Sequence, residues 1–250
     1  MKIILSPAKK MIADTDNIAP VELPAFIDKT AEILGWMKSK SKEELKAIWK
    51  CNDKIAEQNF NRLETMDLYN RLTPAVLAYE GIAFQYMAPA VFEIQQFEYL
   101  QNHLRILSAF YGILKPLDGV TPYRLEMQAK AEIEETTNLY DYWGDRLYHS
   151  VIDDSRIIIN LASKEYSKCI EKYLTPQDRY ISVTFCEASG DKMVTKGTYA
   201  KMARGEMVRF MAENNIENPL DIKKFDRLGY SFRSDLSSDT EYVFERKIEQ

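Results

Sequence analysis

The stretch Arg156-Ile157-Ile158-Ile159-Asn160 gives the clearest β-strand signal in the sequence. Three consecutive β-branched apolar residues between polar ends are typical of a short buried strand. The runs Lys2–Leu5 and Leu104–Ala109 have the same character, although the second of them contains an arginine. Strands of this kind, spread over the whole chain, predict a sheet that draws on distant parts of the sequence.

Helical patterns occur between these strands. Residues 24–66 predict a helical unit of short connected pieces, in which Ser41 and Glu44 form a capping box. A long helix is expected over 198–215, and a β-hairpin pairs Tyr180–Glu187 with Met193–Thr195. Further helices are predicted over 92–103, 139–152 and 164–174, and further strands over 75–79 and within 230–247.

Helices and strands are mixed without strict alternation, and at least one hairpin is present. We therefore predict an α+β fold with a mixed β-sheet surrounded by helices, rather than a doubly wound parallel sheet. No linker, repeat or shift in composition divides the chain, so residues 1–250 are expected to form a single domain.

The bulk composition excludes several classes of protein. Hydrophobic residues make up 46% and charged residues 28% of 250 residues, as in an ordinary globular protein. The apolar runs of the sequence are too short to cross a bilayer, and its N-terminus lacks a secretory pattern. A cytoplasmic protein without membrane contact is therefore expected. Three distant cysteines and two histidines predict neither disulfides nor a zinc site, and no cofactor or metal is expected.

The charge balance allows a polyanionic partner. The net charge is −5, but 33 Lys and Arg residues are enough to build a local basic patch. In the predicted long helix, Lys201, Arg204 and Arg209 lie among apolar residues that point all round the helix axis. Buried cations must pair with carboxylates or face a solvated cavity, so these residues form either structural ion pairs or the wall of an anion site.

Several other segments mix polar and apolar residues in the same way. Arg105 lies in a strand, and Arg124 and Glu126 follow a turn. Asn160 ends the predicted strand Arg156–Asn160, and Ser163 follows it. Loops after strands are common places for ligands in α/β proteins. Together these segments predict one polar cleft lined by arginine and lysine.

Ser6-Pro7-Ala8-Lys9 fits the pattern S-x-x-K, in which a lysine can activate a serine. The companion motifs of that chemistry are absent, because Lys196-Gly197-Thr198 has the wrong order. A serine N-cap followed by proline at the first helical position is the simpler interpretation, and it makes Lys9 an anion ligand near a helix N-terminus.

The same segments, in the same order, resemble the peroxide stress protein YaaA family over nearly the whole chain. The residues that carry the resemblance are Ser6–Lys9, His103–Asp118, Pro122–Met127, Leu139-Tyr140, Trp143–Asp145, Asn160–Ser163, Glu165-Tyr166, Tyr199–Gly205, Gly229-Tyr230 and Ser237-Ser238. Where the family has Lys-Gly-Asp this chain has Glu80-Gly81-Ile82, so Glu80 and Ile82 are not counted among the candidate site residues.

The resemblance implies a cytoplasmic bacterial protein that helps cells survive hydrogen peroxide by limiting free iron and the DNA damage that iron causes. It also implies DNA binding through a positively charged cleft and a helix-hairpin-helix-like element. The best match to that element is Ser41–Arg62, with Cys51-Asn52 in place of the usual Ile-Ser at the turn. Such a turn offers backbone N–H groups and lysines to phosphates without reading bases.

Two functions are open at this point. The first is binding of double-stranded DNA by structure rather than sequence; its candidate residues are Lys9, Lys46, Lys50, Lys54, Arg62, Arg105, Arg124, Asn160, Ser163, Lys201, Arg204 and Arg209. The second is an enzyme acting on a nucleotide, nucleobase or nucleic acid, with Ser6, Lys9 and Glu126 as candidate catalytic residues. Direct storage of iron has little support, since no acidic ligand cluster is present, and the oligomeric state stays open.

Overall fold

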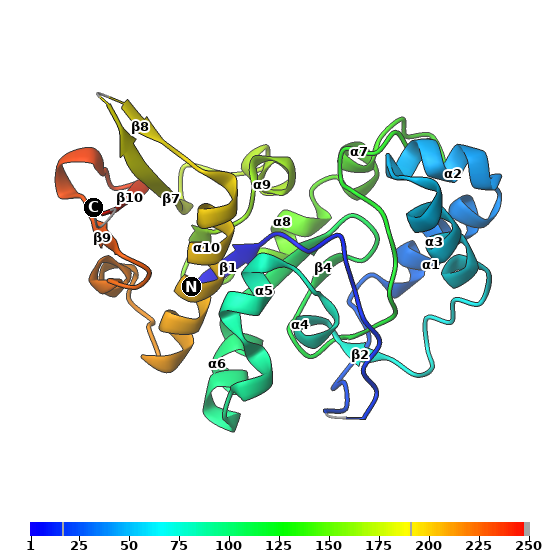
Figure 1. Ribbon diagram of the computed structural model, residues 1–250, viewed down its shortest axis with the longest axis horizontal. Coiled ribbons are helices and arrows are strands. Elements are labelled where there is room, and N and C mark those ends of the chain that lie inside the picture. Colours follow the sequence, from blue (N-terminus) through cyan, green and yellow to red (C-terminus); the bar gives the residue numbers. More distant parts are fainter. Residues whose placement is uncertain (17, 191, 248–250) are drawn as a thin grey trace.

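The described part of this protein contains an eight-stranded sheet of mixed direction. The computed structural model describes residues 1–16, 18–190 and 192–247. Within them the sheet has the order β4-β3-β1-β6-β7-β10-β9, with β8 paired to β7 (Figure 1). Its strands are β1 Lys2–Leu5, β3 Leu104–Ser108, β4 Gly112–Leu114, β6 Ile157–Asn160, β7 Arg179–Ser189, β8 Lys192–Val194, β9 Tyr230–Phe232 and β10 Glu241–Arg246. The predicted mixed sheet is confirmed.

The centre of this sheet is parallel. β1 pairs with β3 on one side, where Ile4 is in register with Arg105, and with β6 on the other, where Ile4 is in register with Asn160. β6, β7 and β10 continue the parallel run, whereas β4, β8 and β9 pair antiparallel. The chain crosses from β1 to β3 and then back past β1 to β6. Such a reversal is where open α/β sheets leave a crevice at the carboxyl ends of the strands.

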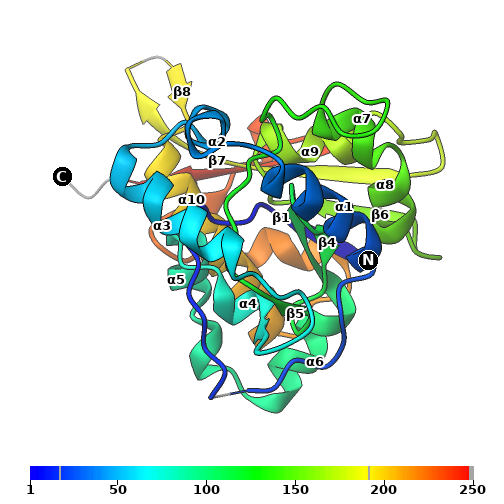
Figure 2. The same cartoon turned by 90° about the vertical axis from the view of Figure 1, so that its right-hand side faces the viewer.

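Helices cover both faces of the sheet. The views in Figures 1 and 2 place α10 with α5 and α6 on one side, and α8 and α9 on the other. The bounds are α4 Ala75–Ala78, α5 Ile82–Met87, α6 Ile94–His103, α7 Leu139–Trp143, α8 Arg146–Val151, α9 Lys164–Glu171 and α10 Gly197–Glu213, with short 3-10 turns at Pro89–Val91, Pro219–Lys224 and Ser234–Leu236. None of the described helices is long and apolar enough to cross a membrane.

The predicted helical unit is present as three helices: α1 Ile27–Lys38, α2 Lys42–Trp49 and α3 Asp53–Glu64. The capping box of Ser41 and Glu44 starts α2 as predicted. Leu45 and Trp49 turn inward from α2 and are buried. Figure 1 shows this unit beyond the end of the sheet toward which β1 points, so the carboxyl ends of the parallel strands face it.

Two sequence predictions about local structure are wrong. Residues 75–79, predicted as a strand, instead form the helical turn α4 after the two-residue strand β2 Thr73–Pro74, which pairs with β5 Gly119–Val120. A short apolar run of this length fits a buried turn of helix as well as a strand. The helix predicted to start at Ser6 is also missing, because the segment after β1 continues as irregular chain.

The C-terminal part agrees with the sequence more closely. β7 and β8 form the expected hairpin, with Glu187 opposite Val194; Asp191, which the sequence predicts in its turn, lies outside the described residues. β9 and β10 are the two strands expected within 230–247.

The predicted helix over 139–152 is interrupted at Gly144, whose φ of +56° ends α7.

Candidate functional site

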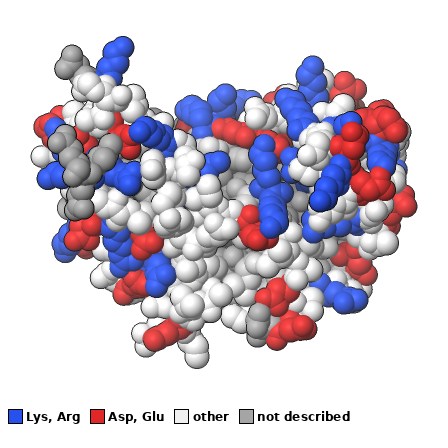
Figure 3. All heavy atoms as spheres, viewed as in Figure 1, with Lys and Arg blue, Asp and Glu red and all other residues white. Residues whose placement is uncertain are grey.

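A pocket of about 400 Å³ lies at the carboxyl ends of β1 and β6. Its walls are the segment after β1 (5–10), residues 80–84 at the start of α5, residues 123–126, the segment after β6 that leads into α9, and one face of α10. Figure 3 shows this face of the molecule hollowed in its middle, with Lys and Arg side chains gathered along the side of the hollow nearer to α2 and α3. The pocket therefore lies at the crevice that the strand order predicts.

Two glycines let the pocket walls approach one another. A Cβ added to Gly205 of α10 would lie 1.9 Å from the carbonyl oxygen of Ala83 in α5. A Cβ added to Gly81 would lie 2.6 Å from the Cβ of Ala8, in the segment after β1. Real side chains do not pack at these distances, so any residue larger than glycine would separate α10 from α5, or α5 from the β1 loop. The width of the pocket depends on both contacts.

Ion pairs fix most of the charged side chains that line the pocket. Lys9 Nζ lies 2.8 Å from Glu126 Oε2, and Lys10 Nζ lies 2.8 Å from Glu80 Oε2. Glu126 also lies 3.7 Å from the guanidinium of Arg124. Among the described residues, five cations and three carboxylates line the pocket, so they give its wall a net positive charge although the whole chain is acidic.

Arg204, like Lys201, forms no such ion pair with the described residues. It lines the pocket from α10, and its Nε is buried without a hydrogen-bond acceptor among the described residues. Burial alone lowers the pKa of its guanidinium from the usual value. A buried donor left without an acceptor destabilises the folded state by about 1–3 kcal/mol. An apolar residue at this position would not have this cost, so the arginine indicates a functional role. Lys201, one turn earlier in α10, lines the same wall and is exposed.

Ser6 and Ser163 hold the β1 and β6 loops together. Ser163 N–H donates to Ser6 Oγ at 2.8 Å, and Ser6 O–H donates to Ser163 Oγ at 3.1 Å. Within the described part of the chain Ser6 makes no hydrogen bond with Lys9, which is paired with Glu126 instead. The arrangement is therefore a serine pair that joins two strand ends, and it differs from the lysine-activated serine of the S-x-x-K pattern.

A chain of buried hydroxyl groups lies behind the pocket. Tyr123 lines the pocket, and its hydroxyl is 2.9 Å from that of Tyr79 and 2.7 Å from Ser108 Oγ. Ser108 Oγ in turn accepts the backbone N–H groups of Phe110 and Tyr111. Burial raises the pKa of Tyr123 to about 12, so its hydroxyl stays protonated and acts as a neutral hydrogen-bonding group.

The structure brings together most of the residues predicted for the cleft. Those that line the pocket are Ser6, Lys9, Arg124, Glu126, Ser163, Lys201 and Arg204. Asn160 does not line it, but its Oδ1 accepts the N–H of Ala162 at 2.9 Å and so shapes the loop that carries Ser163.

Two predicted arginines lie elsewhere. Arg105 is buried near the start of β3, and its guanidinium donates to the carbonyl groups of Gln101 and Leu104 at 3.0 and 2.7 Å. Arg209 is on α10 but pairs with Glu213 at 2.8 Å outside the pocket. Both are satisfied by protein groups, so neither of them lies at the cleft where the sequence predicted them.

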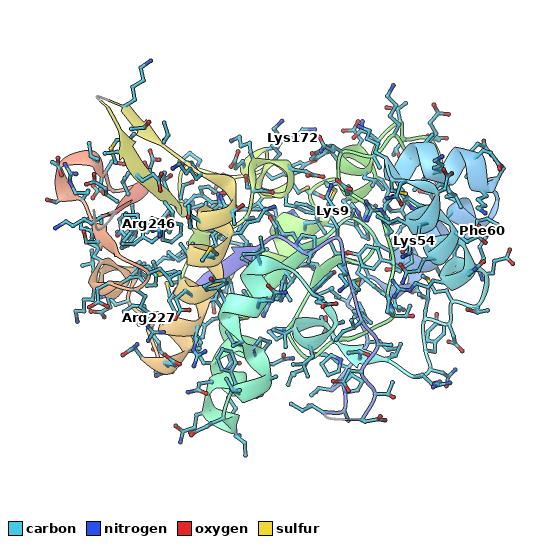
Figure 4. All side chains as sticks on the ribbon, in the orientation of Figure 1. Lys9, Lys54, Phe60, Lys172, Arg227 and Arg246 are labelled. Carbon is cyan, nitrogen blue, oxygen red and sulfur yellow. The ribbon has the colours of Figure 1, made fainter. Side chains whose placement is uncertain are left out.

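The predicted cations of the helical unit lie beside the pocket rather than in it. Arg124 donates to the carbonyl oxygen of Trp49 at 3.4 Å and so connects the pocket to the end of α2. Lys50 follows in the left-handed conformation with a φ of 46°. Lys54 is exposed on α3, and in Figure 4 it lies on the side of that helix toward Lys9. Arg62 donates to the carbonyl of Met11 at 3.4 Å.

A helix-hairpin-helix element is not established by this geometry. α2 and α3 do form a hairpin, but Asn52 caps the N–H of Ile55 at the start of α3 at 3.0 Å. Lys46 pairs with Asp53, and Lys42 with Glu57. Part of the charge and part of the backbone donors expected to face phosphates are thus satisfied within the hairpin.

Other residues that line the pocket were not predicted from the sequence. Glu80, Gly81 and Ile82 line the pocket, although the first and third were set aside because they depart from the family pattern. Lys10 and Glu165 also line it. The resemblance at Glu165-Tyr166 was the available signal for the last of these.

The described residues offer no obvious metal site. Among residues 1–16, 18–190 and 192–247, no group of three or more His, Cys, Asp or Glu side chains is placed to hold an ion. Burial raises the pKa of Cys169 to about 12 and also raises that of Cys186. Both thiols are therefore protonated near neutral pH, a state that reacts slowly with peroxide.

Fold and site together define an α/β protein with a cationic pocket at the carboxyl edge of its parallel strands. The sequence profile described as peroxide stress protein YaaA matches residues 1–236. An UPF0246 protein of Agathobacter rectalis is 84% identical over 248 residues, which cover 99% of this chain and all of the relative. UPF0246 proteins of Lachnoclostridium phytofermentans and Ligilactobacillus salivarius are 54% and 51% identical over 98% of this chain, covering 96% and 99% of their own lengths. The chain belongs to the peroxide stress protein YaaA family.

Proposed function

We propose that this protein binds double-stranded DNA in the cytoplasm during the response to hydrogen peroxide, by backbone and shape rather than by base sequence. Its family supports the role in peroxide stress. The observation that carries DNA binding is the unpaired cation Arg204, which lies in a pocket with Lys9, Arg124 and Lys201. Cations held without protein partners are suited to bind an anion that arrives from outside.

The contact surface extends from the pocket to the helical unit. Lys50 and Lys54 make no ion pair within the described part of the chain, and the Arg124–Trp49 contact holds the end of α2 at the pocket wall. A DNA duplex is wider than its own major groove of about 12 Å and is too large to enter a pocket of about 400 Å³. A duplex must therefore lie over the pocket mouth and along α2 and α3, not inside the pocket.

Salt-dependent binding tests this proposal. Fluorescence anisotropy with a labelled duplex of about 20 base pairs should give an affinity that falls steeply between 50 and 200 mM salt, roughly 0.9 decade per decade of salt for each phosphate neutralised. Lys50→Glu and Lys201→Glu should each weaken binding. Lys224→Glu is the matched control, because Lys224 is an exposed lysine that does not line the pocket. Binding that ignores salt, or equal loss with Lys224→Glu, refutes the proposal.

A second candidate function is an enzyme acting on a nucleotide, nucleobase or nucleic acid. The specific observation that favours it is the Lys9–Glu126 pair inside a pocket large enough for one nucleotide. A pure binder needs cations and has less use for carboxylates and hydroxyls in the same pocket. Loss of a turnover-linked phenotype in Lys9→Ala, with DNA affinity intact, would support it; full function in both Lys9→Ala and Glu126→Ala would exclude it.

A further inference from the structure

One hydroxyl hydrogen in the pocket has no acceptor among the residues that the structure describes. Ser163 N–H donates to Ser6 Oγ, and Ser6 O–H donates to Ser163 Oγ. A serine hydroxyl has a single hydrogen, and that of Ser6 is used by this exchange. Within the described part of the chain, Ser163 Oγ accepts from Ser6 and donates to no group, so its own hydroxyl hydrogen is free. Ser163 lines the pocket, so this donor is available to a ligand.

Backbone donors lie next to it. The first N–H groups of any α-helix have no acceptor inside the helix. In α9 the N–H groups of Tyr166 and Ser167 are taken by the carbonyl of Ser163, whereas those of Lys164 and Glu165 find no backbone acceptor in the part of the chain described. Glu165 and Tyr166 line the pocket, so the positive end of the α9 dipole is at its wall.

The cations of α10 complete the set. The Nη groups of Arg204 donate to no described residue, and only its Nε is sealed from solvent, so its terminal nitrogens stay open to the pocket. Lys201 has no ion pair in the described chain. The pocket carboxylates, in contrast, are occupied: Glu126 by Lys9, Glu80 by Lys10, and Glu165 by the N–H groups of Gln128.

We infer that the pocket contains a subsite for a phosphomonoester, the terminal phosphate of a nucleotide, bound by Ser163, the first turn of α9, Lys201 and Arg204. A phosphomonoester has three terminal oxygens and up to two negative charges, which these donors match in number and sign. Beside these donors the wall also has apolar and aromatic surface, including Phe84 and Tyr123, against which a nucleoside can pack. The choice of a nucleotide over other phosphate esters rests on the proposed function.

Isothermal titration calorimetry with deoxyadenosine monophosphate, deoxyadenosine and inorganic phosphate tests the subsite. The monophosphate should bind at least about tenfold more tightly than the nucleoside, because charge-assisted hydrogen bonds to the phosphate are lost in the nucleoside. Arg204→Gln should reduce this ratio to about twofold or less, and Lys201→Gln should reduce it in part. Arg209→Gln is the control, since Arg209 lies on the same helix and is paired outside the pocket.

Two sources of the phosphate are distinguished by a DNA hairpin with and without a 5′-phosphate. Preference for the phosphorylated hairpin that disappears in Arg204→Gln assigns the subsite to a strand end. Equal binding of both hairpins, with the monophosphate preference kept, assigns it to a free nucleotide. The inference is overturned when monophosphate and nucleoside bind equally, or when Arg204→Gln keeps the preference. Salt-dependent duplex binding that remains sensitive to Lys50→Glu would then show that only the subsite has failed.

Lys201→Gln keeps the test decisive should Arg204→Gln fail to fold, because Lys201 is exposed and its replacement disturbs no packing. Two results together would equally overturn the subsite. The first is a folded Lys201→Gln protein that keeps the full preference for the monophosphate over the nucleoside. The second is that neither inorganic phosphate nor the nucleoside competes with the monophosphate.

Discussion

Lys9 and Glu126 are 117 residues apart in sequence, yet Lys9 Nζ lies 2.8 Å from Glu126 Oε2 across the wall of the pocket. Glu126 is the more buried partner, with a side chain 19% exposed against 66% for Lys9, and Arg124 approaches it from the other side. One carboxylate therefore restrains two cations of the pocket. Removing the carboxylate of Glu126 therefore distinguishes between the two proposed functions, DNA binding and catalysis.

Glu126→Gln should strengthen DNA binding by about twofold to fivefold, because it frees Lys9 and Arg124 and a partly exposed ion pair is worth up to about 1 kcal/mol. The measurement is the dissociation constant for duplex DNA at fixed salt. Glu217→Gln, an exposed residue outside the pocket, makes the same change in net charge and should have little effect. A Glu126→Gln protein that binds DNA as before and loses a pocket-linked reaction would favour the enzyme.

Arg204→Met should make the protein more stable, by about 1 kcal/mol in the free energy of unfolding. The substitution keeps an unbranched side chain and removes a cation whose Nε is buried without an acceptor in the described part of the chain. Urea denaturation followed by circular dichroism measures the change. Greater stability with weaker binding is the signature of a residue kept for its ligand; a loss of stability would show that Arg204 has a structural partner.

Gly205→Ala should destabilise the protein by about 1–3 kcal/mol, because its Cβ would lie 1.9 Å from the carbonyl oxygen of Ala83 and force α10 away from α5. Gly35→Ala is the matched control within α1, where an added Cβ meets no atom within 4 Å. Alanine favours a helix over glycine by roughly 0.5–1 kcal/mol, so that control should be neutral or stabilising. Equal effects at both positions would contradict the close helix contact.

Asp118 should make the protein less stable as the pH rises from 5 to 8. Burial raises the pKa of this carboxyl to about 7, despite the N–H of Lys115 that donates to it. A raised carboxyl pKa means that the folded state holds the proton longer than the unfolded state, so stability is lost as the pH rises toward 7. The loss attributable to Asp118 is about 2–3 kcal/mol over this range.

Asp118→Asn should remove this pH dependence, measured as the difference in unfolding free energy between variant and wild type at each pH. The comparison cancels His103, whose pKa is lowered by burial and whose effect has the opposite sign. Asp153, with a pKa lowered to about 2, titrates below the range used. Parallel pH profiles for the two proteins would show that Asp118 does not titrate near neutrality.

Much of the site could be predicted from the sequence because its residues directly follow short apolar strands. Ser6 and Lys9 come after β1, and Ser163 comes after β6; parallel strands bring such segments to one edge of the sheet. Arg204 could be singled out because a cation in a helix that is apolar all round must face either a carboxylate or a cavity. The choice between these two needed the structure.

The residues that the sequence placed wrongly or missed have two physical causes in common. One is the direction of a strand relative to the pocket, and the other is contact between segments far apart in the sequence. Arg105 is the second residue of β3, so it lies near the start of the strand, whereas the end of the strand faces the pocket. The sequence around Arg105 does not show which end of the strand faces the pocket. Glu80 and Gly81 reach the pocket only because Gly81 packs against Ala8, a contact between segments 73 residues apart. Periodicity describes the faces of a local element, not the partners that cover them.

DNA binding by this pocket is tested most directly by the salt dependence of duplex DNA affinity for the wild type, Lys201→Glu and Lys224→Glu proteins. A pocket whose unpaired cations hold the DNA backbone predicts a steep slope for the wild type, and a slope smaller by about one for Lys201→Glu alone. Identical slopes for all three proteins would contradict the central claim that the cations of this pocket bind a polyanion.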